Sequence, residues 1–212
     1  GILKNINETD LNKIHEIQVL NEFQKKPLTW KENSSFGSII KNSILENKLE
    51  KLITNVKTYP SKVIKTYVNE VERILILEDN ELVCSKLVLA ADGSGSYLRE
   101  ASSINYIEHD LKSIAINGYL SSETFGRNTA RQAFLKEGPI GLLPVKFDKS
   151  YVNFVWSIKD SSYKNIIEKK KISKYISNRL NQFYLNHGIS FDSIKLNNKK
   201  LNNINKWPLK LI

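Results

Sequence analysis

One short segment of the chain combines residue types that could hold a phosphate-bearing ligand. Leu87 to Ala91 is an unbroken apolar run, and Asp92 and Gly93 follow it directly. Runs of this length are typical of strands that are covered on both faces, as in a parallel sheet. Glycine has no Cβ, so its backbone can approach a ligand closely, and the first amides of a following helix favour an anion. If a helix begins near Ser96, this corner could therefore lie beside the diphosphate of a nucleotide.

Two plainer interpretations of the same corner stay open. Asp-Gly is a common turn between strands, so Asp92 and Gly93 could do no more than reverse the chain. The segment from Gly93 to Leu98 could also be a dinucleotide motif of the Gly-x-Gly-x-x-Gly kind. Leu98 stands where that motif has its last glycine, and no βαβ unit follows it, so this second interpretation is incomplete.

The spacing of apolar residues predicts the elements that precede this corner. Residues 8–34 are mostly polar and offer one short strand at 28–30. Helical spacing then predicts a helix from Ser43 to about Asn55. Three alternating runs follow and predict a β-meander, at residues 63–68, 73–77 and 82–84.

The elements after the corner differ in kind. Four longer alternating runs predict an antiparallel sheet, at residues 114–120, 131–135, 140–145 and 151–158. An amphipathic helix with its apolar stripe from Ile172 to Tyr184 follows, and Gly188 suits its C-terminal cap. Residues 195–205 are expected to form a solvated loop. The fold class predicted from these patterns is α/β plus an antiparallel sheet.

The composition excludes several kinds of site and partner. The net charge of +10 comes almost entirely from lysine, and no recognition motif accompanies it, so nucleic acid is not an expected partner. Cys84 is the only cysteine, which excludes an internal disulfide, and the three histidines are far apart, so no metal site is expected. No run reaches the roughly 18 apolar residues of a membrane span and no signal peptide is evident, which indicates a cytoplasmic protein. Because the sequence contains no methionine, we expect it to be incomplete.

Three segments resemble the flavin-dependent aromatic-ring hydroxylases. Residues 87–99 resemble their second flavin motif, an apolar strand followed by Asp-Gly, a small residue, Ser and Arg. Residues 134–145 resemble the Phe…Gly-Pro…Leu-Pro strand pair of the ubiquinone-biosynthesis hydroxylases. The segment from Phe36 to Asn42, which enters the first predicted helix, is similar to the start of a flavin-domain helix in the same family. The resemblance extends from about residue 36 to residue 158.

This resemblance implies a domain organisation. The chain would contain part of an FAD domain of the p-hydroxybenzoate hydroxylase-like fold, joined to a substrate domain with an antiparallel sheet and a long helix. Residues 1–35 would be a substrate-domain segment or linker and residues 36–103 a partial FAD-binding domain. Residues 104–206 would be the substrate-binding domain, and residues 207–212 the start of the return to the FAD domain.

The resemblance also implies site residues. Those expected near FAD are Asp92, Gly93, Ser96, Arg99 and Asn42. Those expected near the substrate are Gly138, Pro139, Leu142 and Pro144, although an apolar strand after Gly-Pro is more often plain core. No side chain is expected to be an obligatory catalyst, because the flavin carries the chemistry.

The implied reaction is the hydroxylation of a polyprenylated phenol by molecular oxygen in ubiquinone biosynthesis, with FAD and NAD(P)H. The implied partners are the inner-membrane surface, through peripheral contact, and a homo-oligomer or a ubiquinone-biosynthesis complex. The first flavin motif and the Gly-Asp motif expected after Pro208 and Leu209 are absent, so the chain alone should be inactive and bind FAD weakly or not at all. The alternatives are a non-enzymatic lipid- or protein-binding module, or another flavin oxidoreductase such as a prenyl reductase or an epoxidase.

Overall fold

The computed structural model describes residues 6–24, 26–93, 95–107, 109–145, 151–163, 172–192 and 205–211. The chain divides into two compact units. The larger unit comprises Gly1–Leu52 and Asp110–Leu209, and the smaller comprises Ile53–His109 and Lys210–Ile212. The predicted domain assignment of 1–35, 36–103, 104–206 and 207–212 concerns FAD and substrate binding, and it stays a prediction.

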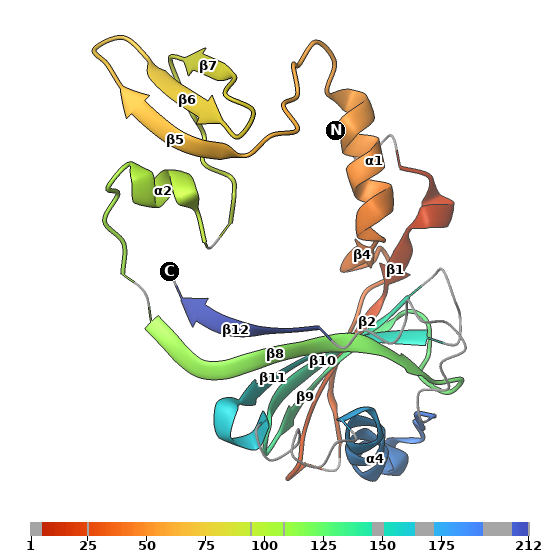
Figure 1. Cartoon of the computed structure of the whole chain (residues 1–212). Helices are drawn as coiled ribbons and strands as arrows, with labels where there is room; N and C mark the ends of the chain where they lie inside the picture. The colour runs from red at the N-terminus through yellow and green to blue at the C-terminus, as the bar shows by residue number, and fades with distance from the viewer. Residues whose placement is uncertain are drawn as a thin grey trace. The chain divides into compact units, whose positions relative to one another are not determined.

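A seven-stranded sheet forms the centre of the larger unit (Figure 1). Its strands, in spatial order, are β12 (Asn205–Leu211), β8 (His109–Ser121), β11 (Tyr151–Lys159), β10 (Gly138–Pro144), β9 (Thr129–Leu135), β2 (Glu16–Asn21) and β3 (Leu28–Lys31). The pairs β8–β11, β11–β10, β10–β9 and β2–β3 are antiparallel. Strand β2 pairs with β9 in the parallel direction, so the sheet is mixed.

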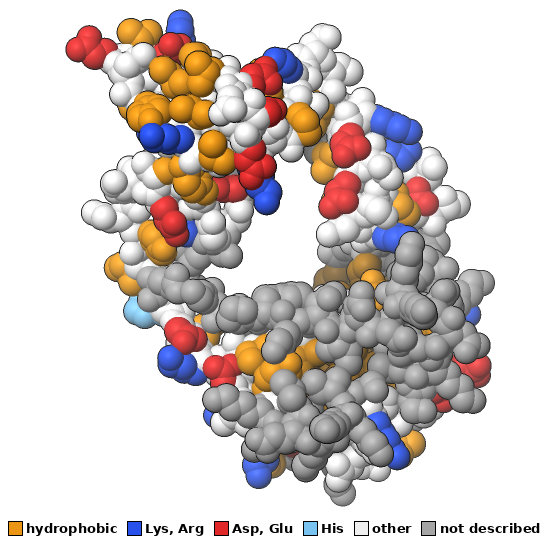
Figure 2. Space-filling model, in the orientation of Figure 1, with side chains coloured by type: hydrophobic (Ala, Val, Ile, Leu, Met, Phe, Trp, Pro, Cys, Tyr) orange, Lys and Arg blue, Asp and Glu red, His pale blue; other side chains and the backbone are white. Residues whose placement is uncertain are grey.

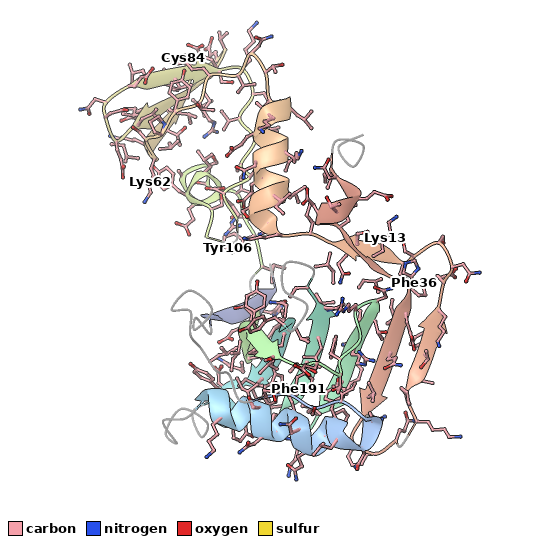
Figure 3. The ribbon with its side chains drawn as sticks, turned by 90° about the vertical axis from the view of Figure 1, so that its right-hand side faces the viewer. Lys13, Phe36, Lys62, Cys84, Tyr106 and Phe191 are labelled. Atoms are coloured by element: carbon pink, nitrogen blue, oxygen red, sulfur yellow. The ribbon has the colours of Figure 1, made fainter. Side chains whose placement is uncertain are left out.

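One face of this sheet is buried beneath helix α4 (Ile172–Tyr184), which lies along one side of the sheet (Figure 3). Alternate residues of each strand point to opposite faces, so every second side chain of β11 enters the core. Phe154 and Trp156 from β11 and Leu180 from α4 are among the fully buried members of that core. The helix continues as a short 3₁₀ turn, Leu185–His187, and ends at Gly188, whose φ of 70° is left-handed.

A small antiparallel ribbon is attached to this sheet through Asn12. It pairs β1 (Asn12–Ile14) with β4 (Gly37–Ile39), and the 3₁₀ turn Glu8–Asp10 precedes it. The side-chain amide of the buried Asn12 donates hydrogen bonds to the carbonyl oxygens of Arg127 (3.0 Å) and Pro144 (2.9 Å). Helix α1 (Asn42–Leu52) follows β4 in the same unit.

The smaller unit is a three-stranded antiparallel meander with one short helix. Its elements are β5 (Val63–Val68), β6 (Arg73–Leu77), β7 (Leu82–Ser85) and α2 (Tyr97–Ala101). The Tyr97 hydroxyl donates to the carbonyl oxygen of Ile64 at 2.7 Å and attaches α2 to β5. Among the described residues of this unit, Leu77 is the only buried hydrophobic side chain. Hydrophobic side chains accordingly appear on its surface over the meander (Figure 2).

The structure confirms most of the predicted elements. The meander, the four later strands, both long helices and the predicted fold class are present. Strands β1, β2, β4 and β12 were not predicted. In β2 only Leu20 is fully buried, and polar and apolar residues alternate only from Glu16 to Val19. The loop predicted at 195–205 lies, up to residue 204, outside the described residues. Among the described residues, no helix has the length and apolar character that a membrane span requires.

The predicted buried strand at Leu87–Ala91 is wrong. This segment is irregular, and the side chains of Leu87 and Leu89 are 72% and 80% exposed. A buried parallel strand needs neighbouring strands to pair with its backbone and layers to cover its faces. Among the described residues, no strand pairs with this segment, so its apolar pattern is not matched by burial.

An ion-pair network attaches α4 to two turns of the sheet. Nε and Nη2 of Arg179 donate to the two carboxylate oxygens of Glu137 at 2.8 and 3.0 Å, and Nη2 also donates to Glu22. The Arg179 side chain is only 14% exposed. Burial raises the pKa of Glu137, but the hydrogen bonds and charge of Arg179 more than offset this and leave that pKa below its ordinary value.

We predict that Arg179→Met destabilises the larger unit by about 2 kcal/mol or more, because two partly buried carboxylates lose their partner. Chemical denaturation followed by tryptophan fluorescence measures this effect. Lys112→Met is the matched control, since Lys112 forms its pair with Asp110 at the surface and its loss should change stability far less. Equal effects of the two substitutions would contradict the role given to Arg179.

The same network predicts a pH dependence. Glu137 has a lowered pKa in the folded state, so its pairing stabilises the fold fully above the ordinary glutamate pKa. That contribution is lost as the pH falls through the lowered pKa. The stability difference between the wild-type chain and the Arg179→Met variant should therefore decrease in acid.

Candidate functional site

A cavity of about 640 Å³ lies in the larger unit, where α1 begins beside the sheet. Its polar lining includes Asp10, Lys41, Asn42, Tyr119 and Asn153. Apolar side chains complete the wall, among them Ile39, Ile40 and Val145. A volume of this size with mixed walls suits a small organic ligand that carries a few polar groups.

The sheet supplies two of these side chains from its open face, the face opposite α4. Tyr119 of β8 is paired directly with Asn153 of β11. Their sequence neighbours Leu120 and Phe154 point into the core, so both residues project to the other side. The Asn153 amide donates to the carbonyl oxygen of Gly118 at 3.2 Å, which fixes its orientation. Tyr119 and Asn153 were not singled out from the sequence, although strand alternation places them on the face away from the core.

The Asp92 corner lies in the smaller unit and is open to solvent. Gly93 has a φ of 89°, and a Cβ placed on Gly93 or Gly95 would meet no atom within 4 Å. The exposed Asp92 carboxylate accepts a hydrogen bond from the backbone amide of Leu98 at 3.5 Å. Hydrogen bonding by the Ser96 hydroxyl, followed by backbone amides, lowers the pKa of Asp92.

Two further predicted residues organise this corner. Ser96 is 4% exposed and caps α2, because its Oγ accepts from the amide of Arg99 at 3.1 Å. The Arg99 guanidinium lies over the ring of Tyr106, with 4.1 Å between its Cζ and the ring centroid. Arg99 thus links α2 to the segment that leads into β8.

These residues fit the approach of a dinucleotide in one respect. Uncovered glycine backbone leaves room for a bulky phosphate-bearing group, and an exposed carboxylate suits the hydroxyls of a sugar chain. Helix α2 has only five residues, and its first amides already bond to Asp92 and Ser96, so the helix itself is no anion site. The fit comes from the open glycines and from Asp92.

The structure separates the predicted cofactor residues into two groups. Asp92, Gly93, Ser96 and Arg99 lie together in the smaller unit, whereas Asn42 lies in the larger unit and lines the cavity. A role in FAD binding stays a prediction for all five. Among the described residues, no group of three or more His, Cys, Asp or Glu side chains could hold a metal ion.

The four predicted substrate residues have clear structural roles in β10. Leu142 is fully buried in the core beneath α4, and Pro144 is buried on the same face of the strand. Pro139 is exposed and lies opposite Phe134. Gly138 approaches the backbone of β11 closely. The structure thus describes Leu142 as core, and substrate contact by Gly138, Pro139, Leu142 or Pro144 stays a prediction.

Solved structures share this fold. The flavin-dependent halogenase CmlS aligns over 98% of this chain and 40% of its own, with a TM-score of 0.66 and 13% identity. Klebsiella pneumoniae HpxO, solved with FAD and uric acid, aligns over 96% of this chain and 54% of its own, with a TM-score of 0.62 and 10% identity. For 2,6-dihydroxypyridine-3-hydroxylase from Arthrobacter nicotinovorans the shares are 74% and 43%, with a TM-score of 0.59 and 10% identity. The chain therefore has the p-hydroxybenzoate hydroxylase-like fold of FAD-dependent monooxygenases.

Sequence similarity points to one branch of this class. The mitochondrial ubiquinone biosynthesis monooxygenase COQ6 of Xenopus tropicalis is 35% identical over 82 residues, which cover 38% of this chain and 17% of that protein. The rat protein of the same name is 35% identical over 85 residues, 39% of this chain and 17% of its own length. The match thus spans about a sixth of these curated relatives. No family model matches the chain. The resemblance predicted from the sequence is confirmed.

Gly138→Ala should destabilise the larger unit by about 3 kcal/mol or more. Gly138 has a φ of 140°, and a Cβ there would lie 2.0 Å from the carbonyl oxygen of Ser157. Gly141→Ala in the same strand is the control, because its Cβ would lie 3.9 Å from the nearest atom, the carbonyl oxygen of Val155. Thermal unfolding measures both, and a Gly138→Ala chain as stable as the Gly141→Ala chain would refute this close approach.

Ser96→Ala should raise the pKa of Asp92 toward the ordinary aspartate value, because the Ser96 hydroxyl is the main cause of its lowering. An NMR titration of the Asp92 carboxyl carbon measures the change. Ser102→Ala is the control, since Ser102 accepts its hydrogen bond from Arg73 and should leave the titration of Asp92 unchanged. An Asp92 titration that is identical in the wild-type and Ser96→Ala chains would disprove the assignment.

Proposed function

We propose that this chain is part of a flavin-dependent monooxygenase that hydroxylates a polyprenylated phenol in ubiquinone biosynthesis, using FAD, NAD(P)H and molecular oxygen. The observation that carries the proposal is the 35% identity to ubiquinone biosynthesis monooxygenases within a chain of flavin-monooxygenase fold. The fold alone does not decide the reaction, since a halogenase shares it. The sequence match favours the hydroxylase over a prenyl reductase, an epoxidase or a binding module.

The Asp92 corner would hold FAD. The open backbone of Gly93 gives the diphosphate room to approach, and the Asp92 carboxylate accepts hydrogen bonds from sugar hydroxyls. Ser96 lowers the pKa of Asp92 and caps α2, and Arg99 fixes that helix against Tyr106. The corner would thereby hold the cofactor that supplies the hydride-accepting and oxygen-activating chemistry of the proposed reaction.

The cavity at the start of α1 would receive the phenol ring. The Tyr119 hydroxyl and the Asn153 amide lie on paired strands and can orient a ring hydroxyl through hydrogen bonds. Charged side chains of both signs, Lys41 with Asp10 and Glu46, also line this cavity. The buried core behind Tyr119 and Asn153 keeps water from the ring on that side.

The proposed substrate also suggests where the protein acts. A polyprenylated phenol dissolves in a bilayer, so the enzyme would make peripheral contact with the inner membrane, and the named relatives are mitochondrial proteins. A homo-oligomer or a complex of ubiquinone-biosynthesis enzymes would fit the same task. Because the match covers 17% of each relative, we propose that residues 36–103 are part of an FAD domain and residues 104–206 of a substrate domain in a longer enzyme. Residues 1–35 would belong to the substrate domain, and residues 207–212 would begin the return to the FAD domain.

Deletion of the gene that encodes the full protein should cause a polyprenylated phenol lacking one ring oxygen to accumulate, as detected by mass spectrometry of quinone intermediates. The wild-type gene should restore the normal profile, and a gene carrying Asp92→Ala should restore it about tenfold less well, because bound FAD would lose a charged hydrogen-bond acceptor. Ser102→Ala, in the same unit but outside the corner, is the matched control. An unchanged quinone profile after deletion would reject the proposed function.

A further inference from the structure

The turn between β2 and β3 presents an aromatic side chain directly to solvent. Phe23 is 94% exposed, the highest value among the exposed large hydrophobic residues. Its backbone amide donates to the side-chain oxygen of Asn21 at 2.8 Å, so the turn itself is held by a local hydrogen bond. A single exposed ring is ordinary, and it marks an interaction surface only where further exposed hydrophobic residues lie beside it.

Neighbouring hydrophobic residues lie at the same end of the sheet. Leu28 starts β3 and is 56% exposed, and Phe134 of β9 is paired with Asn21 and is 49% exposed. The β9–β10 turn lies beside the β2–β3 turn, because the amide of Lys136 donates to a carboxylate oxygen of Glu22 at 2.6 Å. We call the described residues of these two turns, 21–24, 26–28 and 134–139, the sheet tip.

The charges at the sheet tip are arranged so that the cations face outward. The two acidic side chains there, Glu22 and Glu137, both form ion pairs with the partly buried Arg179. Lys26 and Lys136 are exposed on the same two turns. The tip therefore combines exposed aromatic rings with outward lysines, while its two carboxylates share the single positive charge of Arg179.

We propose that the sheet tip docks on an anionic lipid surface, with Phe23 and Phe134 among the headgroups and Lys26 and Lys136 against the lipid phosphates. The inference rests on the proposed function, because it gives a bilayer-dissolved substrate a defined point of entry. Aromatic side chains favour the membrane–water interface, and each lysine near an anionic leaflet strengthens binding about fivefold. Charge complementarity favours this occupant over a second copy of the chain, whose net charge is also strongly positive at +10.

Co-sedimentation of the 212-residue chain with vesicles tests the proposal. The chain should bind vesicles of phosphatidylcholine with phosphatidylserine and bind phosphatidylcholine alone far less. Lys26→Gln with Lys136→Gln should weaken binding to anionic vesicles about 25-fold, from two losses of about fivefold each. Phe23→Ser should weaken it several-fold without a change in circular dichroism, because a side chain exposed to 94% supports little of the fold.

The matched control is Lys48→Gln with Lys51→Gln on α1, which removes the same charge away from the sheet tip. Equal weakening by both double variants would overturn the proposal, since overall charge would then explain binding. Self-association in the absence of lipid that Phe23→Ser abolishes would also overturn it, by identifying a second copy as the occupant. Vesicle binding is measured without flavin or turnover, so an unchanged quinone profile after gene deletion would reject the proposed function and leave this result standing.

Discussion

Burial of one sheet face against α4 is the constraint on which the larger unit depends. Apolar residues at alternate positions of five strands must leave water together, and the helix supplies the matching stripe of Ile176, Leu180 and Tyr184. Once that face is occupied, the remaining side chains necessarily point the other way. Tyr119 and Asn153 reach the cavity for this reason, and the polar site is thus a consequence of how the core is built.

At one end of the sheet, residues that pack the fold lie beside residues that are proposed to bind a membrane. Gly138 permits β10 and β11 to approach, and the indole of Trp156 donates to its carbonyl oxygen at 3.1 Å. Arg179 holds both turns of the sheet tip to α4 and pairs with both of their carboxylates. With these carboxylates held toward Arg179, the lysines and aromatic rings of the tip remain exposed on the outside. Residues that stabilise the fold and residues that are exposed for binding therefore lie next to one another in these turns.

The two units differ in how many hydrophobic side chains they bury. The larger unit contains the hydrophobic core, whereas Leu77 is the only buried hydrophobic residue described in the smaller one. The flavin-motif corner lies in that less buried unit, with its glycines open and Leu87 and Leu89 exposed. A corner of this kind depends on a ligand or on further polypeptide for burial, which agrees with the proposal that FAD binding belongs to a longer enzyme.

The sequence by itself determined most of the elements and, through its resemblance to the flavin-dependent hydroxylases, the fold class. Alternation predicted the meander and the four long strands, and helical spacing predicted α1 and α4, because these signals are local. Only the tertiary structure decided that β2 enters the sheet beside β9, that Leu142 is core while Tyr119 faces a cavity, and that Leu87–Ala91 is uncovered. Those outcomes depend on which distant segment lies next to each strand, and the residues of a strand do not by themselves specify its neighbours.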